Sequence, residues 1–190
     1  MITRKIDLLK KIYDRNAENG SFIVKVSINK YTDIFNDLDP SPLRRRDLDQ
    51  DFISYLEDCS SDIPLKYGME LHILCPEAIH DTVKEERARA GIRTYCNLMM
   101  LTCRSRLVSS YKLSTLYVIV FILLESIVFT FGPRLHENIF TETLFQGISI
   151  GGWVFLWEAI ALLFIKNNKT RIFFKRHQRL ENSPVSYFYS

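Results

Sequence analysis

The chain has 190 residues, a formal net charge of +3 and a mean hydropathy of −0.03, which allow one compact domain together with a membrane segment. The near-zero mean hydropathy is an average over two different segments: residues 1–112 are rich in charge, and residues 113–165 are almost uncharged. The N-terminus, MITRKIDLLKKIYDRN, carries charges throughout and lacks an uninterrupted apolar segment, so we expect no secretory signal peptide there.

The first elements predict an amphipathic helix and a strand. Residues 3–17 place apolar side chains at helical spacing, and Gly20 is a suitable stop for this helix. The helix either docks on the folded domain or rests on the membrane surface. Residues 21–28, SFIVKVSI, alternate apolar and polar side chains, which is typical of a strand.

A second helix and a second strand follow the loop NDLDPSP. Asp49 is a suitable N-cap for a helix that ends at Pro64, with its inner face formed by Phe52, Ile53, Leu56 and Cys59. MELHILC (69–75) predicts the next strand. The order strand, helix, strand with the usual crossover predicts two adjacent, parallel strands, and therefore a small α/β fold.

From Pro76 the apolar spacing is helical again and predicts a long helix that leads into residue 113 or ends just before it. Gly91 and the pair Ser109–Ser110 are the points where a break in this helix is expected, if one occurs. An unbroken helix would couple movement of the α/β domain to the apolar segment that follows.

Two apolar runs follow, LSTLYVIVFILLESIVFTF (113–131) and ISIGGWVFLWEAIALLFI (148–165). Each has about 18–19 residues, enough to cross the roughly 30 Å hydrocarbon core of a bilayer. The alternative is a helical hairpin buried in a soluble protein. Strong bases flank both outer ends of the hairpin, whereas the connecting loop holds only Arg134. The positive-inside rule then predicts that both termini are cytoplasmic.

Each apolar run carries one carboxylate near its middle, Glu125 in the first and Glu158 in the second. A charge inside a bilayer is costly, so each side chain is expected to face protein or water. The two differ in depth by about 8 Å, so we do not expect them to pair within one hairpin. Three interpretations stay open: a structural polar contact in an oligomer, an ion or water pathway, and a tolerated acid without a role.

The second run also contains residues suited to helix packing. Gly151 and Gly152 permit close approach of a neighbouring backbone, and Gly151 shares the face of Glu158. Trp153 and Trp157 lie on another face, where they either pack on the first run or face lipid. Because two spans do not enclose a pore, any conducting role requires a homo-oligomer.

Residues 167–190, which begin NNKTRIFFKRHQRL, are expected to form a basic cytoplasmic tail. Four bases of this tail are expected to contact anionic lipid headgroups: Lys169, Arg171, Lys175 and Arg176. Nucleic-acid binding is the alternative, since the same composition suits base stacking and phosphate contact. Arg171 and His177 also resemble the ribonuclease motif of HEPN domains, with Ile172 where that motif has a polar residue.

No catalytic residue, cofactor site or metal site is recognised in the rest of the sequence. The histidines are scattered and no glycine-rich phosphate loop occurs. The four cysteines fit no zinc or disulfide spacing and are expected to be free, packed thiols: Cys59, Cys75, Cys96 and Cys103. Aspartates gather between residues 33 and 51, but arginines run through them, so a salt-bridged surface is expected rather than a metal site.

The segment FNDLDPSPLRRRDLDQDFISYLEDCSSDIPLKY (35–67) resembles a family of small bacterial two-span membrane proteins with a DPSP…RDLD segment. A glycine–tryptophan pair often opens the second span of that family, as Gly152 and Trp153 do here, although this chain lacks the family's later YDWWP segment. The motif carries no established activity. Its residues are candidates for binding a partner: Asp39, Pro40, Arg44, Arg45, Arg46, Asp47 and Asp49.

By size and layout the chain also resembles the two-span toxic effectors of bacterial anti-phage systems, including the retron-associated type. That resemblance implies a restraining cytoplasmic partner, such as a reverse transcriptase with its RNA–DNA product. The leading hypothesis is an inner-membrane effector that permeabilises the membrane as a homo-oligomer, built from an α/β domain (1–111), a hairpin (112–166) and the tail. The alternative is an anchored interaction or regulatory subunit without conduction.

Overall fold

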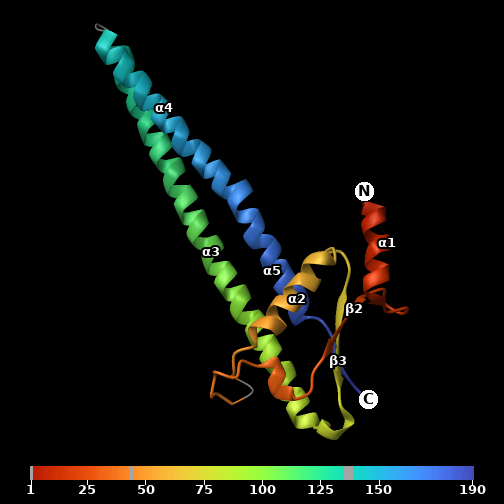
Figure 1. The fold of residues 1–190 in the computed structure, drawn as a ribbon. Coiled ribbons are helices and arrows are strands. Elements are labelled where there is room, and N and C mark those ends of the chain that lie inside the picture. The colour runs from red at the N-terminus through yellow and green to blue at the C-terminus, as the bar shows by residue number, and fades with distance from the viewer. Residues whose placement is uncertain (1, 43–44, 135–138) are drawn as a thin grey trace. The chain divides into compact units, whose positions relative to one another are not determined.

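The computed structural model describes residues 2–42, 45–134 and 139–190, which form helices and one mixed sheet (Figure 1). The chain divides into two compact units. Unit 1 comprises Met1–Leu101 and Phe174–Ser190, and unit 2 comprises Thr102–Phe173. The mixed α/β class predicted from the sequence is confirmed, and so is the presence of two helices long and apolar enough to cross a membrane.

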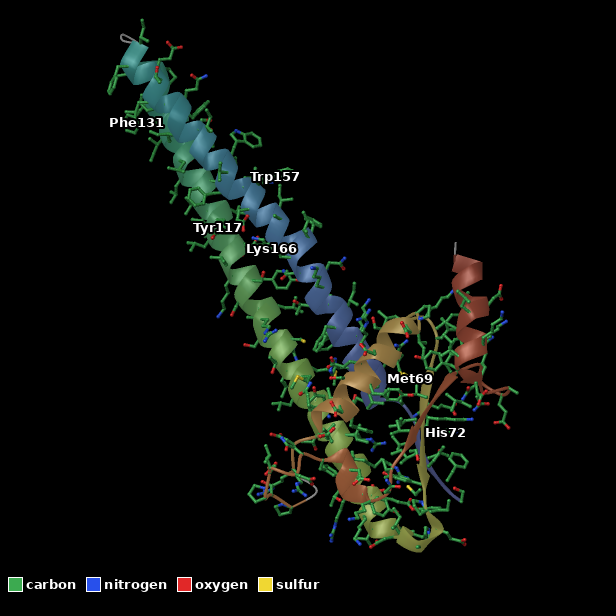
Figure 2. All side chains as sticks on the ribbon, in the orientation of Figure 1. Met69, His72, Tyr117, Phe131, Trp157 and Lys166 are labelled. Carbon is green, nitrogen blue, oxygen red and sulfur yellow. The ribbon has the colours of Figure 1, made fainter. Side chains whose placement is uncertain are left out.

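Unit 1 is built on a four-stranded sheet with the order β1-β2-β3-β4. The strands β2 (Phe22–Ser27), β3 (Met69–Cys75) and β4 (Val185–Tyr189) are parallel, and the short β1 (Asp14–Arg15) pairs antiparallel with β2. Met69 and His72 mark β3 in Figure 2. The predicted adjacency and parallel pairing of the two strands at 21–28 and 69–75 are confirmed.

The helix α2 (Gln50–Asp62) begins where the sequence predicts it. The Asp49 carboxylate accepts hydrogen bonds from the backbone N–H groups of Asp51 at 2.9 Å and Phe52 at 3.1 Å, so it caps the first turn. The predicted inner face of this helix is buried: Phe52, Ile53, Leu56 and Cys59.

The hydrophobic core of unit 1 forms from β2, β3 and the helices α1 (Ile2–Ile12), α2 and α3 (Thr82–Phe131). Phe22 on β2 and Ile73 on β3 are fully buried, and Leu9 on α1 belongs to the same core. The contact of Leu9 favours the docked interpretation of the N-terminal helix. Two short 3₁₀ helices, Tyr31–Ile34 and Glu77–Ile79, follow the carboxyl ends of β2 and β3.

Two boundaries differ from the sequence prediction. The first helix ends at Ile12 rather than at residue 17, because Asp14 and Arg15 pair with β2. Residues 16–20 then form a turn in which Gly20 adopts a positive φ of 73°. The long helix α3 (Thr82–Phe131) starts after residue 81, where the Asp81 carboxylate accepts the N–H groups of the residues two and three positions later.

The C-terminal residues were expected to be a basic tail, and the structure gives them a different form. Asn167–Glu181 is the helix α5, and Val185–Tyr189 is the edge strand β4, paired with β3 from Leu71 to Cys75. Residues 174–190 therefore belong to unit 1. A strand of five residues after a helix carries a weak local signal, and its partner strand lies more than 100 residues earlier.

Unit 2 is a helical hairpin. The second part of α3 runs antiparallel to α4 (Ile139–Ala161), which continues through a π-helical segment, Leu162–Lys166, into α5 (Figure 1). Helix α3 is continuous through Gly91 and Ser109–Ser110. In the most apolar stretch of each long helix, only 6% and 17% of the residues are buried within the protein. A hairpin in the core of a soluble protein would instead have most of these residues buried.

Candidate functional site

The contact between α3 and α4 in unit 2 combines small, aromatic and polar side chains. Ser114 on α3 is buried, and its hydroxyl donates to the backbone carbonyl of Ala159 on α4 at 3.2 Å. The rings of Tyr117 and Phe155 lie 5.7 Å apart, measured between centroids; Tyr117 is labelled in Figure 2. These contacts, at intervals of three to four residues, define the packed face of each helix.

Glu125 has a polar partner inside its own hairpin. The Ser149 hydroxyl on α4 donates to Glu125 Oε1 at 2.9 Å. A methyl group added to Gly152 would lie 3.2 Å from the same oxygen, whereas one added to Gly151 would meet no atom within 4 Å. Gly152 is therefore the glycine that permits close approach next to the acid, and the structure does not give that position to Gly151.

Glu158 pairs with a base eight residues later on the same helical stretch. Glu158 Oε1 forms an ion pair with Nζ of Lys166, which is the last residue of the π-helical segment. Their side chains are 40% and 56% exposed, so the pair sits on the surface of the hairpin. A spacing of eight residues is about two helical turns, which places both side chains on the same side of the helix.

The two tryptophans of the second run are exposed. Trp153 is 61% exposed, although its ring contacts Phe121 on α3 edge-on at 5.7 Å between centroids. Trp157 is 71% exposed. Of the four residues predicted to support helix packing, Gly152 and Trp153 contact α3, whereas Gly151 is open at its Cβ position and Trp157 lies on the exposed surface.

Basic side chains gather in unit 2 at the ends of the apolar segments. Residues 102–112 and 166–173 contain no aspartate or glutamate. Six bases in these segments are exposed: Arg104, Arg106, Lys112, Lys166, Lys169 and Arg171. We call this set the basic collar. Its charge suits the anionic headgroup layer beside a bilayer core.

The four predicted lipid-contacting bases divide between the two units. Lys169 and Arg171 belong to the basic collar of unit 2, where Arg171 donates a hydrogen bond to the hydroxyl of Tyr111 and lies over its ring. Lys175 and Arg176 belong to unit 1, the first exposed and the second half-buried.

The histidine that resembles part of a HEPN motif is in a different setting. His177 is 1% exposed within unit 1, and its Nε2 lies 3.2 Å from Glu57 Oε1. Arg171, the other residue of that motif, is engaged with Tyr111 in unit 2. Each residue thus has a contact of its own that ties it to the fold.

Arg179 was not singled out in the sequence, yet it makes an extensive set of hydrogen bonds in unit 1. Its guanidinium donates to the carbonyls of Ser60 at 2.5 Å, Ile63 at 3.1 Å and Pro64 at 3.1 Å. These carbonyls lie at the C-terminal end of α2, where helix acceptors lack intrahelical partners. The pKa of Arg179 is lowered mainly because burial removes water from the guanidinium, and further by repulsion from the charge of Arg176.

The DPSP…RDLD segment closes a loop on itself. The Asp39 carboxylate accepts the backbone N–H groups of Ser41 at 2.9 Å and Asp47 at 2.8 Å, and these bonds, the Asp47 one first, hold its pKa below the usual value. Within the described part of the chain no ion pair joins these aspartates to Arg45 or Arg46. The Asp39 carboxylate is therefore satisfied by backbone N–H groups rather than by the salt bridges that the sequence suggested.

The predicted partner-binding residues differ in accessibility. Pro40, Arg45 and Asp47 are exposed, whereas Asp39, Arg46 and Asp49 are half-buried. Asp49 caps α2, and Arg46 donates to the carbonyl of Asp37 at 3.3 Å, so both have structural contacts. Arg44 lies outside the described residues.

The cysteines and metal-ligating groups give no reactive centre among the residues that the structure describes. All four cysteines are free and buried, as predicted, and burial raises the pKa of the Cys96 thiol to about 12. The described residues contain no group of three or more His, Cys, Asp or Glu side chains that would hold a metal ion. Comparison with protein-family models, with curated proteins and with solved structures finds no match for this chain.

Proposed function

We propose that this protein is an effector of the bacterial inner membrane that perturbs the bilayer as a homo-oligomer. The observation that carries the proposal is the Glu158–Lys166 pair on the surface of the hairpin, with both side chains substantially exposed. At about 12 Å along the helix from Lys166, Glu158 would lie within the hydrocarbon core. Exposure of a carboxylate to lipid is costly, so a second copy or water is the favoured neighbour.

The charge distribution supports the orientation used in this proposal. The basic collar lies where the apolar segments begin and end, and the loop between the spans has only one strong base, Arg134. Bases retained on one side of a membrane indicate the cytoplasmic side. With that orientation unit 1 is cytoplasmic, and its surface is available to a restraining partner.

The role in anti-phage defence rests on the resemblance to two-span effectors, including those held silent by a reverse transcriptase and its RNA–DNA product. Infection would release that restraint and allow hairpins from several copies to assemble. The exposed residues Pro40, Arg45 and Asp47 are the candidates for contact with the restraining partner.

A second candidate function is an anchored interaction or regulatory subunit without conduction. It is favoured by the bond between Ser149 and Glu125, which supplies that acid with a partner inside a single chain. A glutamate that accepts a hydrogen bond from the neighbouring helix of its own chain stabilises the packing of that hairpin. It does not need a polar partner from a second copy.

The test is the membrane potential of bacteria that express the chain alone, followed with a voltage-sensitive dye beside a growth curve. An effector is expected to depolarise the cells, and Glu158→Gln should alter the ion preference of the leak. Glu142→Gln, an exposed acid at the start of α4, is the matched control and should behave as the wild type. A protein that stays monomeric in the membrane fraction and leaves the potential unchanged would instead favour the anchored subunit.

A further inference from the structure

A pocket of unit 1 opens at the carboxyl ends of the parallel strands β2 and β3. It has a volume of about 440 Å³ and is lined from two connections. Lys30, Tyr31 and Thr32 come from the connection after β2, Ile79 and His80 come from the connection between β3 and α3, and Lys84 comes from the first turn of α3. The edge formed by the carboxyl ends of parallel strands is where open α/β sheets bind their ligands.

The floor of the pocket is held by a network of hydroxyl groups. The Tyr31 and Tyr189 hydroxyl oxygens are 2.9 Å apart, and the Tyr189 hydroxyl donates to the Glu85 carboxylate. The Tyr31 hydroxyl also accepts the backbone N–H of Asp81 at 3.3 Å. This network joins β4, the connection after β2 and the start of α3, so both lining segments are fixed relative to each other.

Basic groups predominate among the polar side chains at the mouth of the pocket. Lys30 is exposed, and none of the ion pairs found in the described ranges involves it. Lys84 pairs with Asp81 at 3.2 Å, but both side chains are about a third to a half exposed, so the pair is weak and open to exchange. The His80 ring packs edge-on against Tyr189, 4.6 Å between centroids, which holds the imidazole at the rim.

The apolar part of the lining comes from Ile79 and the Tyr31 ring. A pocket of this volume, with one apolar wall and a few convergent polar groups, is typical of small-molecule sites. The backbone N–H groups at the start of α3 contribute little to it, because the Asp81 carboxylate already accepts those of Val83 and Lys84. Recognition of a ligand therefore depends on the side chains of Lys30, His80 and Lys84.

We propose that this pocket binds a small phosphate-bearing ligand, with its phosphate between Lys30, His80 and Lys84 and its organic part against Ile79 and Tyr31. The two lysines supply charge-assisted hydrogen bonds to phosphate oxygens, and the ring of His80, whose Nε2 lies 3.8 Å from Glu85 Oε1, supplies a further polar group. The assignment goes beyond the proposed membrane function and does not depend on it, since binding is measured on the purified protein.

The experiment is titration calorimetry of the full chain in detergent with ATP and with inorganic phosphate, in the presence of EDTA. We expect ATP to bind at one saturable site and phosphate to displace it. Lys30→Gln should weaken ATP binding by about ten-fold, since one charge-assisted hydrogen bond is lost. Lys30→Arg, which retains the charge, should restore most of that affinity.

Lys11→Gln is the matched control, because Lys11 is an exposed lysine of α1 away from the pocket and the substitution removes the same charge. It should leave the affinity for ATP unchanged. Any of three results would overturn the assignment: no saturable binding of ATP by the wild type, an equal loss of affinity in Lys11→Gln and Lys30→Gln, or ATP that phosphate fails to displace.

Discussion

The two units of this protein distribute apolar and polar side chains in opposite ways. In unit 1 the core residues Phe22 and Ile73 are 0% exposed. In unit 2 Phe129 is 85% exposed and Phe140 is 79% exposed, whereas the polar Ser114 is 2% exposed. The same residue types therefore serve different purposes in the two units. Unit 1 buries such side chains in a core, whereas the hairpin exposes them on helices that are long and apolar enough to cross a membrane.

This difference changes the part that polar contacts play in holding each unit together. In unit 1 burial of apolar area drives folding, and polar groups such as Arg179 complete helix ends. In a bilayer no hydrophobic force acts between two apolar helices, so close packing at Gly152 and hydrogen bonds such as Ser149 to Glu125 fix the contact.

The largest effect is expected when phenylalanine is replaced by alanine in the core of unit 1, compared with the same replacement on the exposed surface of unit 2. Phe22→Ala should lower the free energy of unfolding of unit 1 by about 3–5 kcal/mol, because it empties a fully buried site beside Tyr67. Phe129→Ala should change it by less than about 0.5 kcal/mol. Hydrogen exchange of peptides from β2 and β3, read by mass spectrometry, measures both. Equal losses would show that the two units do not differ in this way.

A second test removes the buried guanidinium of unit 1. Arg179→Met should destabilise unit 1 by about 3 kcal/mol, because the carbonyls of Ser60, Ile63 and Pro64 lose their donor. Lys175→Met changes an exposed base on the same helix and should be close to neutral. Chemical unfolding followed by circular dichroism gives both values. A neutral Arg179→Met would mean that water replaces the lost donor.

In unit 2 the sharpest test compares neighbouring glycines. Gly152→Leu should separate α3 from α4 and cost about 1–3 kcal/mol, since its Cβ meets Glu125 and Phe121, whereas Gly151→Leu has open space. Both tryptophans of the chain lie on α4, so their emission during thermal unfolding reports on the hairpin. A greater loss in Gly151→Leu would instead place an oligomer contact on that face.

The polar contact in the hairpin is expected to be weaker. A double-mutant cycle with Glu125→Ala and Ser149→Ala, each of which removes one partner, should give a coupling of about 0.6 kcal/mol, the average for hydrogen bonds between membrane helices. The same tryptophan signal measures the four proteins of the cycle. A coupling near zero would leave Glu125 available for a contact between copies.

The smallest expected effect is on the pH dependence of unfolding, through Asp39 in the loop of the DPSP…RDLD segment. The folded state lowers the pKa of Asp39 below 3.8, chiefly through the N–H of Asp47, so ionisation of Asp39 favours folding. This contribution is present above pH 3.8 and is lost as the pH falls through the lower, folded value. Asp39→Asn should therefore weaken the acid dependence of unfolding measured between pH 7 and pH 3.

Asp37→Asn is the control for that measurement, because no hydrogen bond to the Asp37 carboxylate is found among the residues described. An acid dependence that is equally weakened in both variants would contradict the specific role of Asp39 in closing the loop. A loss of acid dependence in Asp39→Asn alone would show that the DPSP…RDLD segment contributes to folding stability.

Local patterns in the sequence determined several elements of this fold. The bounds of β3, the Asp49 cap of α2 and the buried face of that helix follow from periodicity and capping chemistry, which act within a few residues. The two apolar runs follow from length and composition alone.

Only the tertiary structure decided which groups meet. The span in α4 is apolar on all sides, so its sequence gives no amphipathic face that would identify Gly152 and Ser149 as the residues against α3. The strand β4 owes its place to β3, more than 100 residues away, and the pocket joins connections that follow two different strands. Periodicity reports which side of a helix or strand is apolar. It does not report the partner, because the partner is set by long-range packing energy.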